Sequence, residues 1–120
     1  MAEHNDTGKQ GELLAVNSLK DKGFEILETN WRFKNLEADI IAKKDDCLVI
    51  VEVKTRQSAY FGEPETFVNK QKQKNLIKTA NEYIERSKLE VEVRFDIISV
   101  IIGKQQHQIN HIEDAFLFSH

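Results

Sequence analysis

The sequence has little cysteine, proline or tryptophan, with one residue of each among 120. The single cysteine, Cys47, stands inside an apolar stretch, where a small buried side chain is expected rather than a disulfide or a nucleophile. The only proline, Pro64, falls in the stretch Gln57 to Pro64, which we interpret as a loop. Tyr60 and Phe61 within that loop are either substrate contacts or aromatics that anchor it.

Long hydrophobic runs are also missing. No apolar stretch approaches the ~18 residues of a membrane span, and the first six residues are polar and acidic, unlike a secretory signal. We therefore expect a soluble cytoplasmic protein with no membrane partner. At 120 residues and 40% apolar content the chain suits one domain with an adequate core. We assign residues 1–7 to a flexible tail and residues 8–120 to that domain.

The charge is slightly acidic overall, and its distribution is uneven. A net charge of −3 argues weakly against a nucleic-acid partner. Between Lys54 and Lys78, however, six cations and two anions give a local balance of +4. This segment either holds a phosphate backbone or forms a solvated lysine-rich helix face. The first interpretation makes Arg56, Lys70, Lys72 and Lys74 nucleic-acid-binding residues.

Residues 39–54 predict a β-hairpin, because two apolar runs flank the polar cluster at 43–46. Side chains alternate along a strand, so Glu52 and Lys54 emerge on the face of Leu48 and Ile50. A two- or four-residue turn within 43–46 places residue 42 opposite residue 47 and Asp39 opposite Ile50. Asp39 is then a diagonal neighbour of Glu52, and two carboxylates can share one cation. A turn of odd length would move Asp39 to the other face.

The remaining periodicity predicts helices and strands on both sides of this hairpin. A capping box at Thr7 and Gln10 starts a helix from about Gly8 to Lys22, with Gly23 as its stop. Further elements are expected as a strand over 24–33, a strand over 36–42, a helix over 69–88, and strands over 91–102 and 108–112. These elements predict an α/β layer structure with helices packed on a mixed sheet.

Two charged side chains fall on apolar helix faces. Glu12 lies along the stripe of Val16 and Leu19, so it either reaches solvent at the stripe's end or faces a polar site. Lys72 precedes Leu76 in a row at four-residue spacing and is expected to point at the sheet end or to snorkel.

The aromatic and histidine residues give weaker signals. Trp31 is expected in the core, with base stacking as the alternative. His107 and His111, with Asp114 nearby, have the spacing of a zinc site but lack a helical frame or cysteines, so we interpret both histidines as surface residues. Ala115, Phe116 and Phe118 are expected to fold back as an apolar clamp.

The order of Glu12, Asp39, Glu52-Val53-Lys54 and the Lys72 helix resembles the PD-(D/E)xK nuclease superfamily. The chain further resembles the small bacterial YraN-like family, which is similar in fold to Holliday-junction resolvases. The resemblance rests on Gly11-Glu12, Asn30-Trp31-Arg32, Glu37-Ala38-Asp39-Ile40-Ile41, Val51-Glu52-Val53-Lys54-Thr55-Arg56, Phe61-Gly62, Lys72, Arg94-Phe95-Asp96 and Ala115-Phe116. Ala38 replaces the superfamily's proline and Leu36 the family's usual glycine, and neither change removes a catalytic side chain.

The resemblance implies a restriction-endonuclease-like αβββαβ core. Carried over by position, Asp39 and Glu52 would bind Mg²⁺ (or Mn²⁺) together with the Val53 carbonyl, Lys54 would orient or activate water, and Glu12 would support the metal shell. Resolvase-like chemistry also makes a homodimer plausible, because one junction needs two active sites.

Three functional hypotheses stay open at this point. The first is a metal-dependent endonuclease acting on DNA, including branched DNA. The second is a nucleic-acid-binding or scaffold domain that has this fold and little turnover. The third is that Asp39, Glu52 and Lys54 form only a structural ion-pair cluster.

Overall fold

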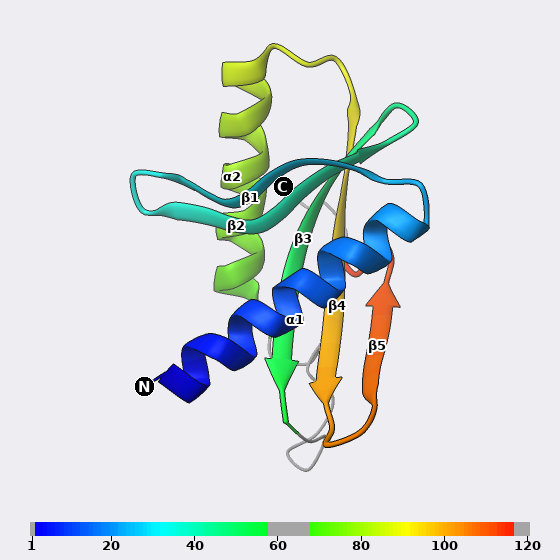
Figure 1. Cartoon of the computed structure of the whole chain (residues 1–120). Helices are drawn as coiled ribbons and strands as arrows, with labels where there is room; N and C mark the ends of the chain where they lie inside the picture. The colour runs from blue at the N-terminus through cyan, green and yellow to red at the C-terminus, as the bar shows by residue number, and fades with distance from the viewer. Residues whose placement is uncertain (1, 58–67, 117–120) are drawn as a thin grey trace.

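The computed structural model describes residues 2–57 and 68–116, with side chains described from Thr7 onward. Two helices flank a five-stranded mixed sheet with the strand order β1-β2-β3-β4-β5 (Figure 1). Strands β3 and β4 are parallel, and the other neighbours are antiparallel. The elements are α1 (Ala2–Asp21), β1 (Glu25–Phe33), β2 (Leu36–Lys44), β3 (Cys47–Arg56), α2 (Lys70–Ser87), β4 (Glu92–Ile102) and β5 (His107–Ile112). The predicted α/β class is confirmed, and the arrangement is compatible with a restriction-endonuclease-like core.

Each face of the sheet carries one helix and one half of the core. In Figure 1, α1 runs diagonally across one face, and α2 stands against the other. On the α1 side the buried residues include Leu19, Val49 and Ile98. On the α2 side they include Leu76 and Phe95. The central strand β3 is therefore buried on both faces, as its continuous apolar sequence predicted.

Helix α1 ends where the sequence predicted and begins earlier. Gly23 has φ +91° and its N–H donates to Lys20 O, while Phe24 N donates to Leu19 O. These two bonds form a Schellman C-cap, which a glycine in the left-handed region favours. The helix starts at Ala2, so residues expected to be a loose tail belong to its first turns. None of the described helices is long and apolar enough to cross a membrane.

Helix α2 has caps at both ends. The Asn69 side chain accepts a hydrogen bond from Lys72 N at 2.9 Å, which satisfies one of the free N–H groups of the first turn. Lys88 ends the helix in the left-handed region and its N–H donates to Ile84 O. The predicted stripe is confirmed, since Leu76 and Ala80 are buried.

The hairpin of β1 and β2 reverses its faces at Asn30 and Asp39. Before this level, the paired residues Thr29 and Ile40 lie on the α1 side. Beyond it, the paired residues Trp31 and Ala38 pack on the α2 side. Asn30 has φ +51°, and it is the one non-glycine residue within a described strand that has a positive φ. A left-handed residue turns the chain sharply, so it accounts for the switch of faces in β1.

The register of β2 and β3 differs from the predicted one by two residues. Residue 42 pairs with Val49 rather than with Cys47, and Ile40 pairs with Val51. Continued by one step, this register sets Asp39 directly opposite Glu52, not diagonal to it. The turn consists of Asp45 and Asp46 between Lys44 and Cys47, which pair with one another. A shift of two residues preserves parity, so Asp39 still faces Glu52.

The chain end after β5 packs as expected where it is described. Phe116 stacks on Phe95 with ring centroids 4.9 Å apart, and Ala115 N donates to Phe95 O at 2.7 Å. Trp31 packs against the α2-side core with its ring edge-on to Tyr83, as the core interpretation predicted. Phe118 and the loop aromatics Tyr60 and Phe61 lie outside the described residues.

Candidate active site

Asp39 and Glu52 meet where β2 and β3 separate. The pairing of these strands stops at Ile40 and Val51. Beyond that point Val53 N donates to Asp39 Oδ2 at 2.8 Å. A side chain therefore accepts the hydrogen bond that a backbone carbonyl of the neighbouring strand would accept if the pairing continued. Asp39 is also hydrogen-bonded to Glu52. The fork between the strands thus holds two carboxyl groups in contact.

The contact between these carboxyl groups changes their proton affinity. Burial raises the pKa of Asp39, and the adjacent Glu52 raises it further, to about 8, although the Val53 N–H and Lys72 oppose the shift. Two like charges in one site cannot both ionise without a cost, so one proton stays on the pair at neutral pH. A divalent cation bound between them would displace this proton.

Glu52 is the ionised member of the pair. Its side chain is only 4% exposed, yet its pKa is lowered, because the hydrogen bond from Asp39 and the charges of Lys72 and Lys54 outweigh the effect of burial. Lys72 Nζ lies 2.9 Å from Glu52 Oε2. Among the described residues no well-directed hydrogen bond reaches that oxygen. Lys72 therefore neutralises Glu52 from hydrogen-bonding distance.

Among the predicted basic residues, Lys72 is in direct contact with this pair. Lys72 points at the sheet end, as its position in the helix row predicted, and Glu52 raises its pKa against the opposing effect of burial. Lys70 and Lys74 on the first turns of α2 are exposed. Lys54 and Arg56 are half-buried at the end of β3. Of these cations, Lys72 from α2 and Lys54 from β3 act on the carboxyl pair.

Glu12 of α1 lies beside Asn30 of β1. Its Oε1 accepts a hydrogen bond from Asn30 Nδ2 at 2.7 Å, and the carboxyl lines a hollow of about 270 Å³ between α1 and β1. Burial raises the pKa of Glu12, and the Asn30 amide partly offsets this rise. Of the two interpretations left open, the polar neighbour is the observed one. None of the contacts described for the carboxylate pair involves Glu12, so its place in a metal shell stays a prediction.

The donor set at the fork fits a hard divalent ion in part. Within residues 7–57 and 68–116, no group of three His, Cys, Asp or Glu side chains converges on a point. Mg²⁺, however, is usually held by one or two carboxylates, with water and substrate phosphate completing the octahedron. The poorly satisfied Oε2 of Glu52 and the proton-sharing Asp39 are oxygens that such an ion would suit. Asp39, Glu52 and the Val53 carbonyl are the residues that would hold it.

Replacing Asp39 by asparagine is expected to stabilise the metal-free protein at pH 7 to 8. The raised pKa means that the stability contributed by Asp39 is complete below its unfolded value of 3.8 and is lost as the pH rises toward about 8. One proton accounts for up to about 1.4 kcal/mol per pH unit. Asparagine keeps an acceptor for Val53 N–H and a donor for Glu52 without this titration. Thermal unfolding from pH 5 to 8 in EDTA should fall less steeply for Asp39→Asn than for wild type, and parallel curves would contradict the assignment.

A second polar cluster joins β4 to β5 on the α1 side. Asp96 is fully buried and accepts hydrogen bonds from Arg94 Nε and Nη2, both at 2.8 Å. His111 Nε2 lies 2.6 Å from Asp96 Oδ2, and Asp114 N donates to Oδ1. The His111 side chain is 2% exposed, so the expectation of a surface histidine was wrong. Lys22 and Phe24 cover its other side.

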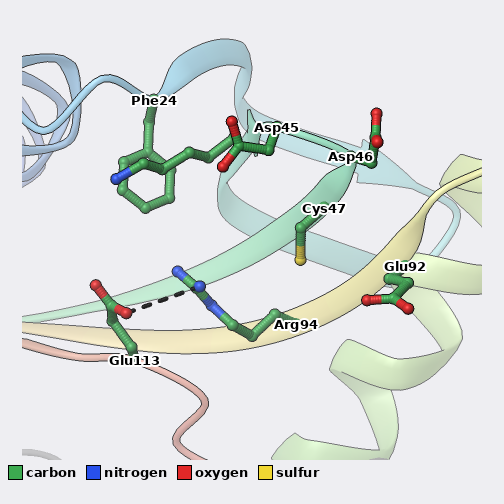
Figure 2. Close-up of a pocket in the computed structure, with 8 residues that line it drawn as sticks. Phe24, Asp45, Asp46, Cys47, Glu92, Arg94 and Glu113 are labelled. Atoms are coloured by element: carbon green, nitrogen blue, oxygen red, sulfur yellow. Dashed lines mark ion pairs between the residues drawn. The ribbon is translucent and has the colours of Figure 1, made fainter.

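Arg94 also lines a cavity of about 460 Å³ at the start of β3 and β4 (Figure 2). Its lining includes Cys47 of β3 and Glu92 of β4, which pair across the two strands. Cys47 lies five residues before Glu52 along β3. Arg94 points toward Glu113, with 3.8 Å between Nη1 and Oε2. Cys47 is half-buried rather than fully buried, and burial raises the pKa of its thiol. The cavity is thus distinct from the fork at Asp39.

Comparison with known proteins places the whole chain among close relatives. The model of a family described as uncharacterised protein family UPF0102 matches residues 11–100. A UPF0102 protein of Flavobacterium psychrophilum is 54% identical over 116 residues, covering 97% of this chain and 98% of the relative. Similar proteins of Thermodesulfovibrio yellowstonii and Bacteroides thetaiotaomicron are 48% and 46% identical. These alignments cover 92% and 97% of this chain, and 96% of each relative.

Proposed function

The chain belongs to the UPF0102 family, and from the geometry of its fork we propose that it is a metal-dependent endonuclease that cleaves phosphodiester bonds in DNA. The observation that carries the proposal is the contact between Asp39 and Glu52. A buried carboxyl pair is costly to maintain without a function, because one of its members must keep a proton at neutral pH. Binding of Mg²⁺ or Mn²⁺ removes this cost.

Each residue of the site has a role in this chemistry. Asp39 and Glu52 would hold the ion, with the Val53 carbonyl as a further ligand. The ion supplies a bound water of lowered pKa and stabilises charge on the phosphate. Lys54, whose field acts on Glu52, orients the attacking water. Lys72 balances the charge of Glu52 and would lie beside the substrate phosphate.

The cations around the fork support a nucleic-acid substrate. The first turn of α2 has no acidic residue and carries Lys70 and Lys72, with Lys74 in the next turn. Lysines are unfavourable near a helix N-terminus, where the helix dipole is already positive. The negative charge of an incoming phosphate backbone would offset both the charge of the lysines and the positive end of the helix dipole. DNA as the substrate class, including branched DNA cut by a homodimer, and a cytoplasmic location are parts of the same proposal.

The test is cleavage of end-labelled duplex, single-stranded and four-way-junction DNA with Mg²⁺ or Mn²⁺. Wild type is expected to cut at least one substrate and to stop when EDTA is added. Asp39→Asn is expected to lose about 100-fold or more in rate, because it removes a charge that holds the ion. Since this variant is expected to be more stable than wild type, unfolding does not explain the loss.

The matched control is Asp45→Asn, the same substitution at an exposed turn residue of the same hairpin. Asn tolerates the positive φ of 56° at this position, so the fold is unaffected. Asp45→Asn should cut at the wild-type rate. Equal cutting by Asp39→Asn, or no metal-dependent cutting by wild type on any of the three substrates, overturns the proposal.

A second candidate follows from the ion pair between Lys72 and Glu52. Because Lys72 already neutralises Glu52 at 2.9 Å, the cluster is electrostatically balanced without metal. A nucleic-acid-binding domain with this fold and no turnover would then use the same lysines. Salt-dependent retention of DNA without cleavage, and no heat of Mn²⁺ binding in calorimetry, would favour this alternative.

A further inference from the structure

Asn30 has two unusual features that the proposed mechanism does not use. It lies in the middle of β1 with a left-handed backbone, whereas Lys34, Asp45, Lys88 and Asp114, which also have a positive φ, lie at turns or a helix cap. Its side-chain amide donates to Glu12 on α1 at 2.7 Å. A non-glycine residue held in this conformation costs of the order of 1 kcal/mol or more, and such strain gathers at functional sites.

The position of Asn30 relates both features to the fork. It lies between the pairs Thr29–Ile40 and Trp31–Ala38, so the register sets it across from Asp39. The hairpin reverses its faces at this level, and the pairing of β2 with β3 ends at the adjacent Ile40. Without this reversal, β2 would stay paired with β3. A backbone carbonyl of β2 would then accept the hydrogen bond from Val53 N–H that the Asp39 side chain now accepts.

We propose that Asn30 is a positioning residue: its left-handed backbone opens the fork in which Asp39 meets Glu52, and its amide holds Glu12 at the level of that fork. The inference rests on the proposed function, because it assigns Asn30 to the same site. The backbone and the side chain make separate contributions. The backbone sets where β2 leaves β3, and the amide fixes the carboxyl of Glu12.

Three variants separate the two contributions. Asn30→Gly keeps free access to positive φ and removes only the amide. Asn30→Val resists positive φ, because a β-branched residue is rarely found there. Lys34→Val is the matched control, since Lys34 has φ +57° in the turn of the same hairpin and touches neither carboxyl group of the pair. It places the same strain in the hairpin away from the fork.

The first measurement needs neither metal nor activity. The Val53 amide proton donates to the Asp39 carboxyl, so its NMR shift and hydrogen exchange report the fork. Asn30→Val is expected to move this resonance and speed its exchange, whereas Asn30→Gly and Lys34→Val leave both at wild-type values. An unchanged Val53 amide in Asn30→Val, or an equal change in Lys34→Val, overturns the backbone part of the inference.

The second measurement is calorimetric titration with Mn²⁺. Removing a residue that orients a site carboxylate typically lowers metal affinity about 10- to 100-fold, so Asn30→Gly should weaken Mn²⁺ binding by that factor. Lys34→Val should bind as wild type does, and unchanged affinity in Asn30→Gly overturns the side-chain part. If wild type binds no Mn²⁺, the proposed function and the side-chain role of Asn30 both fail, while the Val53 amide still decides the backbone part.

Discussion

Asp96→Asn is expected to lower the free energy of unfolding by about 3 kcal/mol. Removing one member of a buried ion pair typically costs about 3–5 kcal/mol, because the remaining charge is left uncompensated. The lower end applies here because the Arg94 side chain is 24% exposed and keeps some hydration. Asparagine also turns an amide donor toward Arg94 and His111, which both approach the present carboxylate.

Urea unfolding at pH 7 measures this loss, and Glu113→Gln is its control. Glu113 approaches the same guanidinium at 3.8 Å, but its side chain is 55% exposed. Exposed ion pairs contribute about 0–1 kcal/mol, so this variant should unfold near wild type. Equal effects of the two substitutions would mean that the buried network adds no more than a surface ion pair.

The pH dependence gives an independent check on Asp96. Burial alone would raise its pKa, but His111, Arg94 and the Asp114 N–H lower it below 3.8. A lowered folded pKa contributes stability that is complete above the unfolded value and is lost as the pH falls through the folded value. Wild type should therefore lose this part of its stability below about pH 4. Asp96→Asn should show a smaller loss over the same acid range.

The helices and strands were predictable because their signals are local. Leu76 and Ala80 repeat with the helical period, and Gly23 and Asn69 have side chains that suit their caps. The apolar run of β3 required burial on both faces, and a helix covers each face. Such features depend on residues a few positions apart, so the sequence alone contains them.

The sequence predicted correctly which side chains of the central hairpin share a face, but the predicted strand register was wrong by two residues. The polar cluster at 43–46 does not reveal which two residues form the turn. Lys43 and Lys44 continue the strand, and Lys44 places its ammonium 5.0 Å from the Phe24 ring centroid. This cation–π contact depends on a residue twenty positions away. The register of Asp39 was therefore decided by tertiary packing.

The left-handed backbone of Asn30 and the burial of His111 were not predictable for the same reason. Asparagine in a polar, exposed-looking strand gives no signal of a left-handed backbone. His111 is buried because β5 pairs with β4 and brings it to Asp96, fifteen residues earlier in the chain. Polar residues reveal such partners only after the strands have been assembled.

Gly11→Ala is expected to destabilise the protein although alanine is the better helix former. Gly11 is buried where α1 crosses β3, and a Cβ at this position would lie 2.7 Å from Thr55 Cβ and closer still to Thr55 Oγ1. Overpacking of this kind typically costs about 1–3 kcal/mol. The helix propensity gained by replacing glycine, about 1 kcal/mol, offsets only part of that cost.

Gly8→Ala is the matched control in the same helix. Nothing lies within 4 Å of a Cβ built at Gly8, so this substitution should raise the free energy of unfolding by about 0.5–1 kcal/mol. Chemical denaturation of both variants measures the difference in sign. If both stabilise the protein, α1 does not approach β3 as closely as the structure has it.

The double variant Gly11→Ala with Thr55→Ala tests the contact itself. Removing Oγ1 and Cγ2 of Thr55 relieves the closest approaches, but its Cβ stays 2.7 Å from the added methyl. The double variant should therefore recover part of the loss and not all of it, which a double-mutant cycle measures as coupling. Thr55 follows Lys54 directly, so a helix pushed outward at Gly11 also displaces the strand end that holds this lysine beside Glu52. Under the proposed function, Gly11→Ala should consequently also lower the rate of DNA cleavage at temperatures where the protein is fully folded.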